Sequence, residues 1–378
     1  MTPSAPSQKR RPLLNPAHVM LGCRFDVWLR VLWQNSFHIR FRSLPQFLLI
    51  TLTSLLMFPF ALLERGVCAR AVRRQQVKEP IFILGHWRSG TTLLQNLLTR
   101  DPALGWFEPL GATACNNSVL LGWLIRPFMR GLLPNARPMD NMKYGEDLPM
   151  EEVFAIADQT PLAVDTLLTF PESYQYYLDA AFVDELPPPQ RAEWERVYRY
   201  ILKKQCWRCK GRQLVMKSPD ATMRAGELFR LYPDAKFIHI YRNPYQVVRS
   251  TINMFTKMMQ LSSLQREPSP QFIEDMIVAT SARIFRKIIS DLPQIPPQQV
   301  LQIRYEDFEQ DPLLWCRRIY EHLGLSGWEQ AAPRMRAYMD SQKGYQKNNF
   351  GEDPRLIAKV NQACGFYFEH YGYQMKEV

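Results

Sequence analysis

One segment of the chain combines a cation, hydroxyl groups and two glycines directly after an apolar run. The segment 85–92 reads GHWRSGTT, follows the uncharged run 80–84 and precedes leucines at helical spacing. The uncharged run predicts a buried strand of a parallel sheet. A strand, a glycine-bounded turn and a helix start form a phosphate cradle, because backbone N–H groups and the positive end of the helix dipole converge on one spot. The segment therefore predicts a site for a phosphate-like anion.

This turn differs from the loop that binds nucleoside triphosphates. Gly85 and Gly90 have the spacing of G-x-x-x-x-G-K-[ST], but Thr91 and Thr92 stand where Lys and Ser/Thr would reach phosphate and magnesium. The cation of the loop is Arg88, before the second glycine. Such a loop can hold a phosphate without magnesium and is poorly equipped to split a triphosphate. A P-loop kinase or NTPase is the disfavoured alternative, which magnesium-dependent hydrolysis would revive.

Two further strand ends carry informative side chains. Arg242 follows the predicted strand 236–241, and Ser250 comes eight residues later. Asn243 and Pro244 predict a helix cap and a first helical residue, so Ser250, two turns in, can lie near Arg242. Lys217 ends the short predicted strand 213–217, where no capping argument requires a lysine.

These motifs together resemble sulfotransferases that use 3′-phosphoadenosine 5′-phosphosulfate (PAPS), and most closely the branch with R-S-G-T-T loops. The resemblance runs from about residue 79 to the C-terminus. It implies that the loop binds the 5′-phosphosulfate and that an Arg/Ser pair, with a late Lys/Arg-Gly loop, binds the 3′-phosphate. The implied cofactor-binding residues are Arg88, Ser89, Gly90, Thr91, Thr92, Arg242, Ser250 and, in the late loop, Lys343, Gly344 or Lys347.

The resemblance also implies the reaction, which is sulfuryl transfer to a hydroxyl or an amine. Lys217 would help the leaving phosphate. Cytosolic members carry their base, a histidine, where this chain has Pro219. We therefore expect another base: first Glu108, since related enzymes have an acidic residue near this distance from the loop, and second His86, since imidazole titrates near neutral pH. His86 could equally be structural.

The role of a second pair of carboxylates, Glu151 and Glu152, has two interpretations. Glu151 and Glu152 precede a predicted helix, where the helix dipole favours acidic side chains. They either belong to that helix N-terminus or take part in the acceptor site.

The strands and helices from residue 79 onward predict one catalytic domain, residues 79–378. Its expected class is α/β, a P-loop-containing nucleotide-hydrolase-like fold with a central parallel sheet flanked by helices and the site at the strand C-terminal ends. A hydrophobic content of 46% over 378 residues is sufficient for a sizeable core.

Residues 1–78 form a different unit, a basic tail followed by membrane-prone helices. Aromatic residues alternate with arginines over 25–42, which predicts a basic amphipathic helix. The uncharged run 47–63, interrupted by Pro59, is at the short limit for a membrane span. Three interpretations stay open: an in-plane or partly inserted membrane anchor, a true span, or a helix packed on the catalytic domain or in an oligomer interface. We expect membrane contact through residues 25–63.

Composition restricts the partners and the compartment. The net charge of +11 suits an anionic cofactor or a membrane surface, and no nucleic-acid-binding signature is present. Seven scattered cysteines favour a reducing compartment, so we expect the cytoplasmic side of a membrane, or the cytoplasm. No metal site is expected. The acceptor is predicted only as a small molecule, with a lipid or another apolar alcohol favoured. A membrane-associated binding protein with a degenerate cofactor site is the second alternative.

Overall fold

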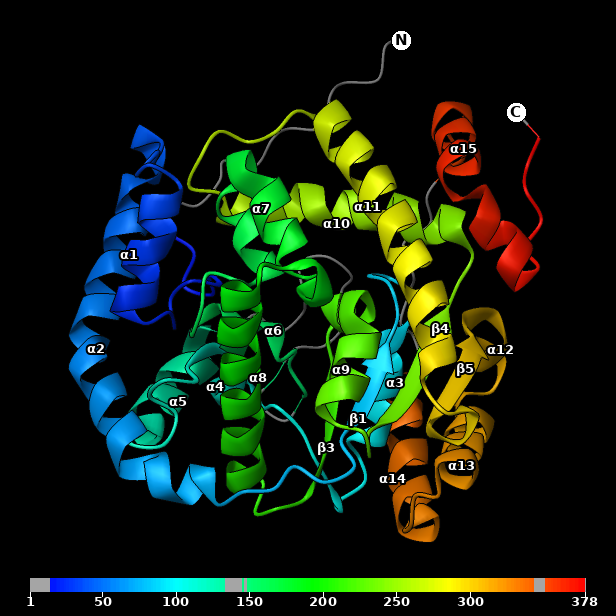
Figure 1. Ribbon diagram of the computed structural model, residues 1–378, viewed down its shortest axis with the longest axis horizontal. Coiled ribbons are helices and arrows are strands. Elements are labelled where there is room, and N and C mark those ends of the chain that lie inside the picture. Colours follow the sequence, from blue (N-terminus) through cyan, green and yellow to red (C-terminus); the bar gives the residue numbers. More distant parts are fainter. Residues whose placement is uncertain (1–13, 133–144, 146–147, 343–350, 378) are drawn as a thin grey trace.

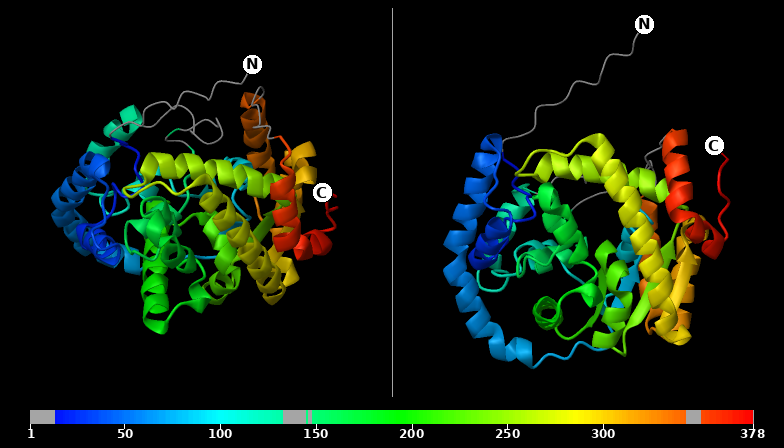
Figure 2. Two further views of the ribbon diagram at one scale, coloured as in Figure 1. Left: turned by 90° about the horizontal axis from the view of Figure 1, so that it is seen from above. Right: turned by 45° about the horizontal axis from the view of Figure 1, so that its top comes forward.

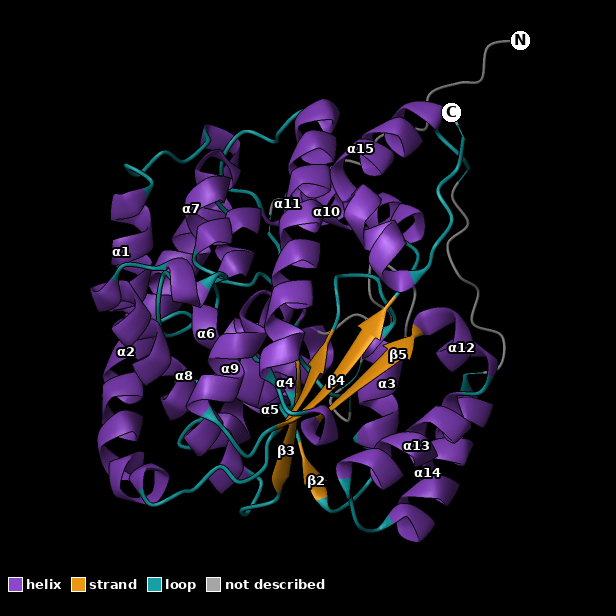
Figure 3. Ribbon diagram, turned by 45° about the vertical axis from the view of Figure 1, so that its right-hand side comes forward, coloured by secondary structure: helices purple, strands orange, loops and turns teal. Residues whose placement is uncertain are grey.

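The centre of the molecule is a parallel sheet. The computed structural model describes residues 14–132, 145, 148–342 and 351–377. Five described strands pair in the order β2-β3-β1-β4-β5, all parallel (Figure 3). Their bounds are β1 Ile81–Leu84, β2 Leu104–Gly105, β3 Gln213–Lys217, β4 Lys236–Tyr241 and β5 Val300–Arg304. The predicted α/β class with a central parallel sheet is confirmed.

Helices cover both faces of this sheet. Ile81 and Ile83 of β1 pack with α3 (Thr91–Leu98), α13 (Pro312–Leu323) and α14 (Trp328–Ser341). Phe82 and Leu84 point to the other face and pack with α8 (Pro188–Arg208) and α9 (Ala225–Leu231). Successive side chains of a strand point to opposite faces, so a strand buried on both sides is a continuous apolar run.

A third core lies beyond the C-terminal ends of the strands (Figure 3). It is formed by α10 (Pro244–Ser262), α11 (Pro270–Asp291) and α15 (Pro354–Tyr371), with α7 (Tyr174–Asp179) beside them. These helices shield the edge of the sheet where the predicted site residues emerge.

The N-terminal helices pack against this third core. α1 (Phe25–Gln34) and α2 (Leu44–Arg73) lie side by side along one edge of the molecule (Figures 1 and 2). Trp28 is fully buried in the core shared with α10 and α11, and its Nε1 donates to Thr51 Oγ1 of α2 at 3.0 Å. The boundary near residue 78 stays a prediction, although α1 and α2 are structurally joined to the catalytic domain.

The remaining elements connect these layers. The short helices are α4 (Pro109–Thr113), α5 (Gly122–Leu132), α6 (Val153–Ala157) and α12 (Tyr305–Gln310). The 3₁₀ helices are η1 (Phe41–Ser43), η2 (Val164–Leu168), η3 (Pro171–Ser173), η4 (Val183–Glu185), η5 (Pro219–Arg224), η6 (Leu292–Gln294) and η7 (Pro297–Gln299).

Candidate active site

The strand register brings the predicted segments to one edge of the sheet. β1 lies between β3 and β4, with Ile83 opposite Lys217 and Leu84 opposite His239. Lys217 therefore ends β3 beside the start of the loop 85–90, and Arg242 follows β4 on the other side. Parallel sheets of this type bind ligands at this edge.

Both loop glycines are required by their surroundings. Gly90 precedes α3 with φ +100°, and a Cβ on it would lie 2.3 Å from the Tyr305 ring. A Cβ on Gly85 would lie 2.5 Å from Ser89 Oγ, and the Gly85 N–H donates to Thr222 Oγ1 at 2.8 Å. A side chain at either position would therefore collide with the packing around the turn.

The loop side chains differ in exposure. Ser89 and Thr91 are buried, whereas Arg88 and Thr92 are half-buried. The Ser89 hydroxyl donates to the His86 carbonyl oxygen at 2.8 Å, which fixes the turn internally. Arg88 adopts φ +69°, which is unusual for a residue with a side chain. Their predicted contacts with a phosphosulfate stay predictions.

Three predicted cofactor residues meet directly. Arg88 Nε donates to Ser250 Oγ at 3.0 Å, and Arg242 Nη1 donates to the Arg88 carbonyl oxygen at 3.0 Å. The Arg242 guanidinium carbon lies 4.1 Å from the centre of the Tyr305 ring, a cation–π arrangement. Two cations therefore lie where the N-terminus of α3 already favours an anion.

The helix that carries Ser250 begins as predicted. Asn243 caps α10, its side-chain oxygen accepting the Tyr245 N–H at 3.0 Å, and Pro244 is the first helical residue. Ser250 itself is buried beneath Arg88. Helix geometry thus delivers a residue eight positions after Arg242 to the loop.

Lys217 lies among carboxylates. Its side chain is 2% exposed and forms an ion pair with Glu151, whose side chain is 18% exposed. Asp165 of η2 is half-buried close by, and its pKa is raised by burial, Glu151 and Asp220, against the opposite effect of Lys217. Asp220 accepts from Ser218 Oγ and pairs with Arg224. The cation at the end of β3 is thus paired with Glu151, a carboxylate that still reaches solvent.

Glu152, next to Glu151, has a different environment. It is fully buried, and burial together with the nearby Asp220 raises its pKa to about 8. Neither of its carboxylate oxygens has a hydrogen-bond partner within the described ranges. A buried carboxyl without partners is kept protonated by its surroundings.

The first base candidate, Glu108, lies in a separate set of contacts. Its carboxylate forms an ion pair with Arg208 and accepts from Gln205 Nε2 at 2.9 Å, both on the last turns of α8. The base role of Glu108 stays a prediction. The contact with Lys217 favours Glu151 over it.

The second base candidate, His86, is buried. Its Nδ1 lies 2.9 Å from the Trp87 carbonyl oxygen and its Nε2 lies 3.0 Å from Ser281 Oγ. Burial lowers the pKa of His86 to about 4. These contacts favour the structural interpretation, and a role as base stays a prediction.

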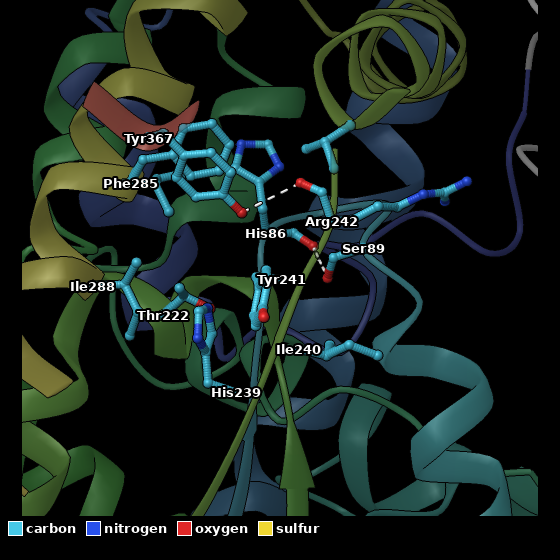
Figure 4. Close-up of a pocket in the computed structure, with 12 residues that line it drawn as sticks. His86, Ser89, Thr222, His239, Ile240, Tyr241, Arg242, Phe285, Ile288 and Tyr367 are labelled. Carbon is cyan, nitrogen blue, oxygen red and sulfur yellow. Dashed lines mark hydrogen bonds between the residues drawn. The ribbon is translucent and has the colours of Figure 1, made fainter. Parts of the chain in front are cut away.

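A small cavity lies behind the loop (Figure 4). Its volume of about 10 Å³ is the space of about one water molecule. Figure 4 shows His86, Phe285 and Tyr367 at one side of it, while the Arg242 side chain points away. The cavity is too small for a nucleotide, so it does not correspond to the predicted anion site.

Three predicted cofactor residues are outside the structural description. Lys343, Gly344 and Lys347 lie outside the described residues, so their roles stay predictions. Among the residues that are described, no group of three or more His, Cys, Asp or Glu side chains could hold a metal ion.

Sequence reasoning missed the partners of the predicted residues. Tyr305 contacts both Gly90 and Arg242, and its only sequence signal is that it directly follows β5 at the same edge of the sheet. Asp165 carried no motif, because the polypeptide between α6 and α7 has no regular pattern.

Comparison with known proteins identifies the family of the chain. The model of the Sulfotransferase family matches residues 80–330. An omega-hydroxy-beta-dihydromenaquinone-9 sulfotransferase, Stf3, from Mycobacterium bovis is 30% identical over 362 residues, which cover 94% of this chain and 92% of that protein. The chain therefore belongs to the sulfotransferase family, as its motifs predicted.

Solved structures show the same fold. Sulfotransferase STF1 from Mycobacterium tuberculosis superposes with a TM-score of 0.65 at 17% identity, covering 89% of this chain and 92% of STF1. Sulfotransferase STF9 from Mycobacterium avium gives a TM-score of 0.61 at 17% identity, with 83% and 82% covered. The predicted P-loop-like α/β fold is thereby confirmed.

Proposed function

We propose that this sulfotransferase takes its sulfuryl group from PAPS and transfers it to the hydroxyl of a lipid or another apolar alcohol. The observation that supports PAPS as the sulfuryl donor is the direct contact of Arg88 with Ser250 and of Arg242 with the loop 85–90. This arrangement offers two cations and a helix N-terminus to a ligand with two separate anionic groups.

The residues of the site have complementary roles in this proposal. PAPS supplies an activated sulfuryl group whose bond to the bridging oxygen of the 5′-phosphate breaks as the acceptor oxygen attacks in line. Arg88, the loop N–H groups and Lys217 stabilise the charge that develops on that bridging oxygen, each worth about 3 kcal/mol. A carboxylate accepts the acceptor proton, with Glu151 favoured by its contact with Lys217.

Two observations support an apolar acceptor. The relative Stf3 is named for a menaquinone derivative, and α2 exposes many leucines to solvent. Membrane contact through residues 25–63 would bring such an acceptor within reach. We place the protein on the cytoplasmic side of a membrane, or in the cytoplasm, since its seven cysteines are free thiols.

Binding of the desulfated cofactor tests the donor. We expect 3′-phosphoadenosine 5′-phosphate to bind the wild-type protein without magnesium, as measured by calorimetry, and adenosine 5′-monophosphate to bind much more weakly. Arg242→Ala should weaken binding by roughly 10²-fold, because a charge-assisted hydrogen bond to phosphate is lost. The matched control is Arg317→Ala, an exposed arginine on α13.

Equal binding of both nucleotides, or an unchanged affinity in Arg242→Ala, would remove PAPS from the proposal. A magnesium-dependent hydrolysis of triphosphate would instead revive the kinase alternative.

The acceptor is tested separately. The enzyme is incubated with radiolabelled PAPS and with lipid, carbohydrate and protein fractions. We expect the label in the lipid fraction. Label confined to soluble carbohydrate or protein would exclude an apolar acceptor and leave the donor proposal intact.

A further inference from the structure

The outer side of α2 is an exposed apolar surface. One side of the helix is buried and includes Ile50, Ala61 and Glu64, while the other side projects leucines into solvent. Leu56 and Val67 are each 63% exposed. The exposed large apolar side chains of α2 are Leu48, Leu52, Leu55, Leu56, Phe60, Leu62, Leu63 and Val67. Contiguous apolar surface of this extent marks an interaction site.

This helix is long and apolar enough to cross a membrane, but its buried side is fixed to the domain. Glu64 is fully buried, pairs with Lys204 of α8 and accepts the N–H groups of Val119 and Leu120 at 2.9 and 2.8 Å. Crossing a bilayer would remove α2 from these partners and leave a buried carboxylate and ammonium uncompensated. That cost is several kcal/mol per ion, so α2 stays on the domain.

A second helix extends the same surface. Because Glu64 of α2 accepts hydrogen bonds from the backbone of residues 119 and 120, α5 starts directly beside α2, as Figure 1 shows. α5 exposes Trp123 at 75%, Phe128 at 66% and Leu124. At the other end of α2, the last turn of α1 exposes Trp33, and the α1–α2 connection exposes Phe41. We name the exposed apolar residues of α2 and α5, together with Trp33 and Phe41, the α2/α5 face.

The charges on the α2/α5 face have a single sign. The segment 39–63 and helix α5 contain arginines and no aspartate or glutamate. Arg40, Arg42, Arg126 and Arg130 are exposed beside the apolar residues. Apolar and aromatic side chains framed by arginines are complementary to a bilayer whose headgroups are anionic, and a soluble protein partner would not require this one-sided composition.

We propose that the α2/α5 face lies flat on an anionic membrane, with α2 in the plane of the surface and α5 as a second insertion element. The apolar side chains enter the boundary between headgroups and acyl chains, and the arginines contact lipid phosphates. This orientation keeps the sheet and the loop 85–90 on the aqueous side, where a soluble anionic donor arrives. The proposal does not depend on the identity of the donor or the acceptor.

Sedimentation of the full chain with vesicles tests this surface. Vesicles contain equal parts of phosphatidylcholine and phosphatidylglycerol, or phosphatidylcholine alone. The triple variant Leu52→Gln, Leu56→Gln, Leu63→Gln and the double variant Trp123→Ser, Phe128→Ser should each bind at least roughly tenfold more weakly, because the removed side chains no longer enter the membrane. Thermal unfolding of each variant verifies that it is folded.

The charge component is measured with Arg42→Gln and Arg126→Gln. Each should lower affinity for the anionic vesicles about fivefold and leave the weaker binding to neutral vesicles unchanged. The matched control is the double variant Leu314→Gln, Met375→Gln, which removes two exposed apolar side chains from α13 and the C-terminal segment, at the opposite edge of the molecule.

Four results would overturn the proposal. The first is wild-type protein that does not sediment with anionic vesicles, and the second is a control variant that loses as much binding as the face variants. Bound protein that resists extraction by alkaline carbonate would indicate a span instead of an in-plane helix. Self-association in ultracentrifugation that the face variants abolish, without vesicle binding by the wild type, would assign the face to a second copy of the chain.

Discussion

The burial of Lys217 at the end of β3 and its ion pair with Glu151 determine what these two residues can do in the reaction. The side chain is almost fully buried at the end of β3, yet its partner Glu151 retains contact with solvent. A buried ammonium needs a nearby negative charge in the free enzyme. In the proposed reaction, the developing charge on the leaving phosphate can take over that function, which frees Glu151 to accept a proton.

Lys217→Met should therefore lower the rate of sulfuryl transfer by about 10²–10³-fold, because one donor to the developing charge is removed. The rate is measured in single turnover with saturating PAPS. The matched control is Lys236→Met, which removes another ion-paired lysine from the opposite end of the sheet. Equal losses in the two variants would mean that Lys217 has a structural role only.

Glu152 gives a prediction about stability and pH. Its folded pKa of about 8 is above its unfolded value, so the buried neutral form stabilises the fold fully below about pH 4.5. That contribution is lost as pH rises through about 8. Glu152→Gln imitates the protonated carboxyl and should stabilise the protein increasingly from pH 4.5 to 8, by up to about 5 kcal/mol.

Urea unfolding of wild type and Glu152→Gln across this pH range measures the difference. The control is Glu321→Gln, an exposed carboxylate on α13. A constant difference between wild type and Glu152→Gln at all pH values would contradict the raised pKa.

The sequence indicated which charged residues belong to the site. It did not indicate which of them pair with one another. Arg242 and Ser250 were linked by helix geometry, and the structure brings both to Arg88. The carboxylate beside Lys217 could not be assigned, because Glu151 reaches it from a chain segment with no regular spacing to β3. Distance along the sequence favoured Glu108 as the base; it forms an ion pair with Arg208, and its role as base stays a prediction.

At the scale of elements, the strand–turn–helix unit from β1 to α3 is defined by local rules. The apolar run becomes a strand buried on both faces, Gly90 supplies the left-handed turn, and the leucines of α3 face the sheet. The contact of Gly90 with Tyr305 adds a long-range restriction, because it fixes the turn against the end of β5.

Gly90→Ala tests this restriction. The new methyl group would collide with Tyr305, and the left-handed backbone adds about 1 kcal/mol of strain. We expect binding of 3′-phosphoadenosine 5′-phosphate to weaken by more than about tenfold. Gly211→Ala is the control, because Gly211 has φ +78° but no atom near the position of its Cβ.

Calorimetry measures both variants. If Gly211→Ala weakened binding as much as Gly90→Ala, the contact with Tyr305 would have no specific role.

Long helices were harder to predict than the loop. The apolar run 47–63 was expected to be interrupted at Pro59, but α2 continues through it from Leu44 to Arg73. Tertiary contacts on the buried side, such as those of Ile50 and Glu64, outweigh the missing hydrogen bond of one proline. Hydropathy alone could not separate a span from a helix with one buried side, because both are rich in leucine.

At the scale of the whole molecule, a buried ion pair joins the N-terminal helices to the sheet layers. Lys204 Nζ of α8 lies 2.5 Å from Glu64 Oε1 of α2, and the two side chains are 2% and 0% exposed. Lys204 also donates to the Cys115 carbonyl oxygen. The pair therefore connects α2, α8 and the segment before α5 in one buried network.

Lys204→Met should lower the free energy of unfolding by about 3–5 kcal/mol, because it leaves the Glu64 carboxylate buried without its counter-ion. Urea denaturation measures this change. The control, Arg317→Met, breaks an exposed pair and should cost less than about 1 kcal/mol. A cost for Lys204→Met as small as that of the control would show that α2 is not held by this pair.

The contact between Arg88 and Ser250 also has a consequence for how the enzyme would discriminate among nucleotides. Arg88 belongs to the predicted subsite for one end of PAPS, and Ser250 to the subsite for the other. Ligand groups at the two ends would then be thermodynamically coupled, since occupying one subsite orders a residue of the other. A nucleotide with a single phosphate should therefore lose more binding free energy than the contribution of the missing phosphate alone. A double-mutant cycle at Arg88 and Ser250 would measure this coupling as a non-additive energy.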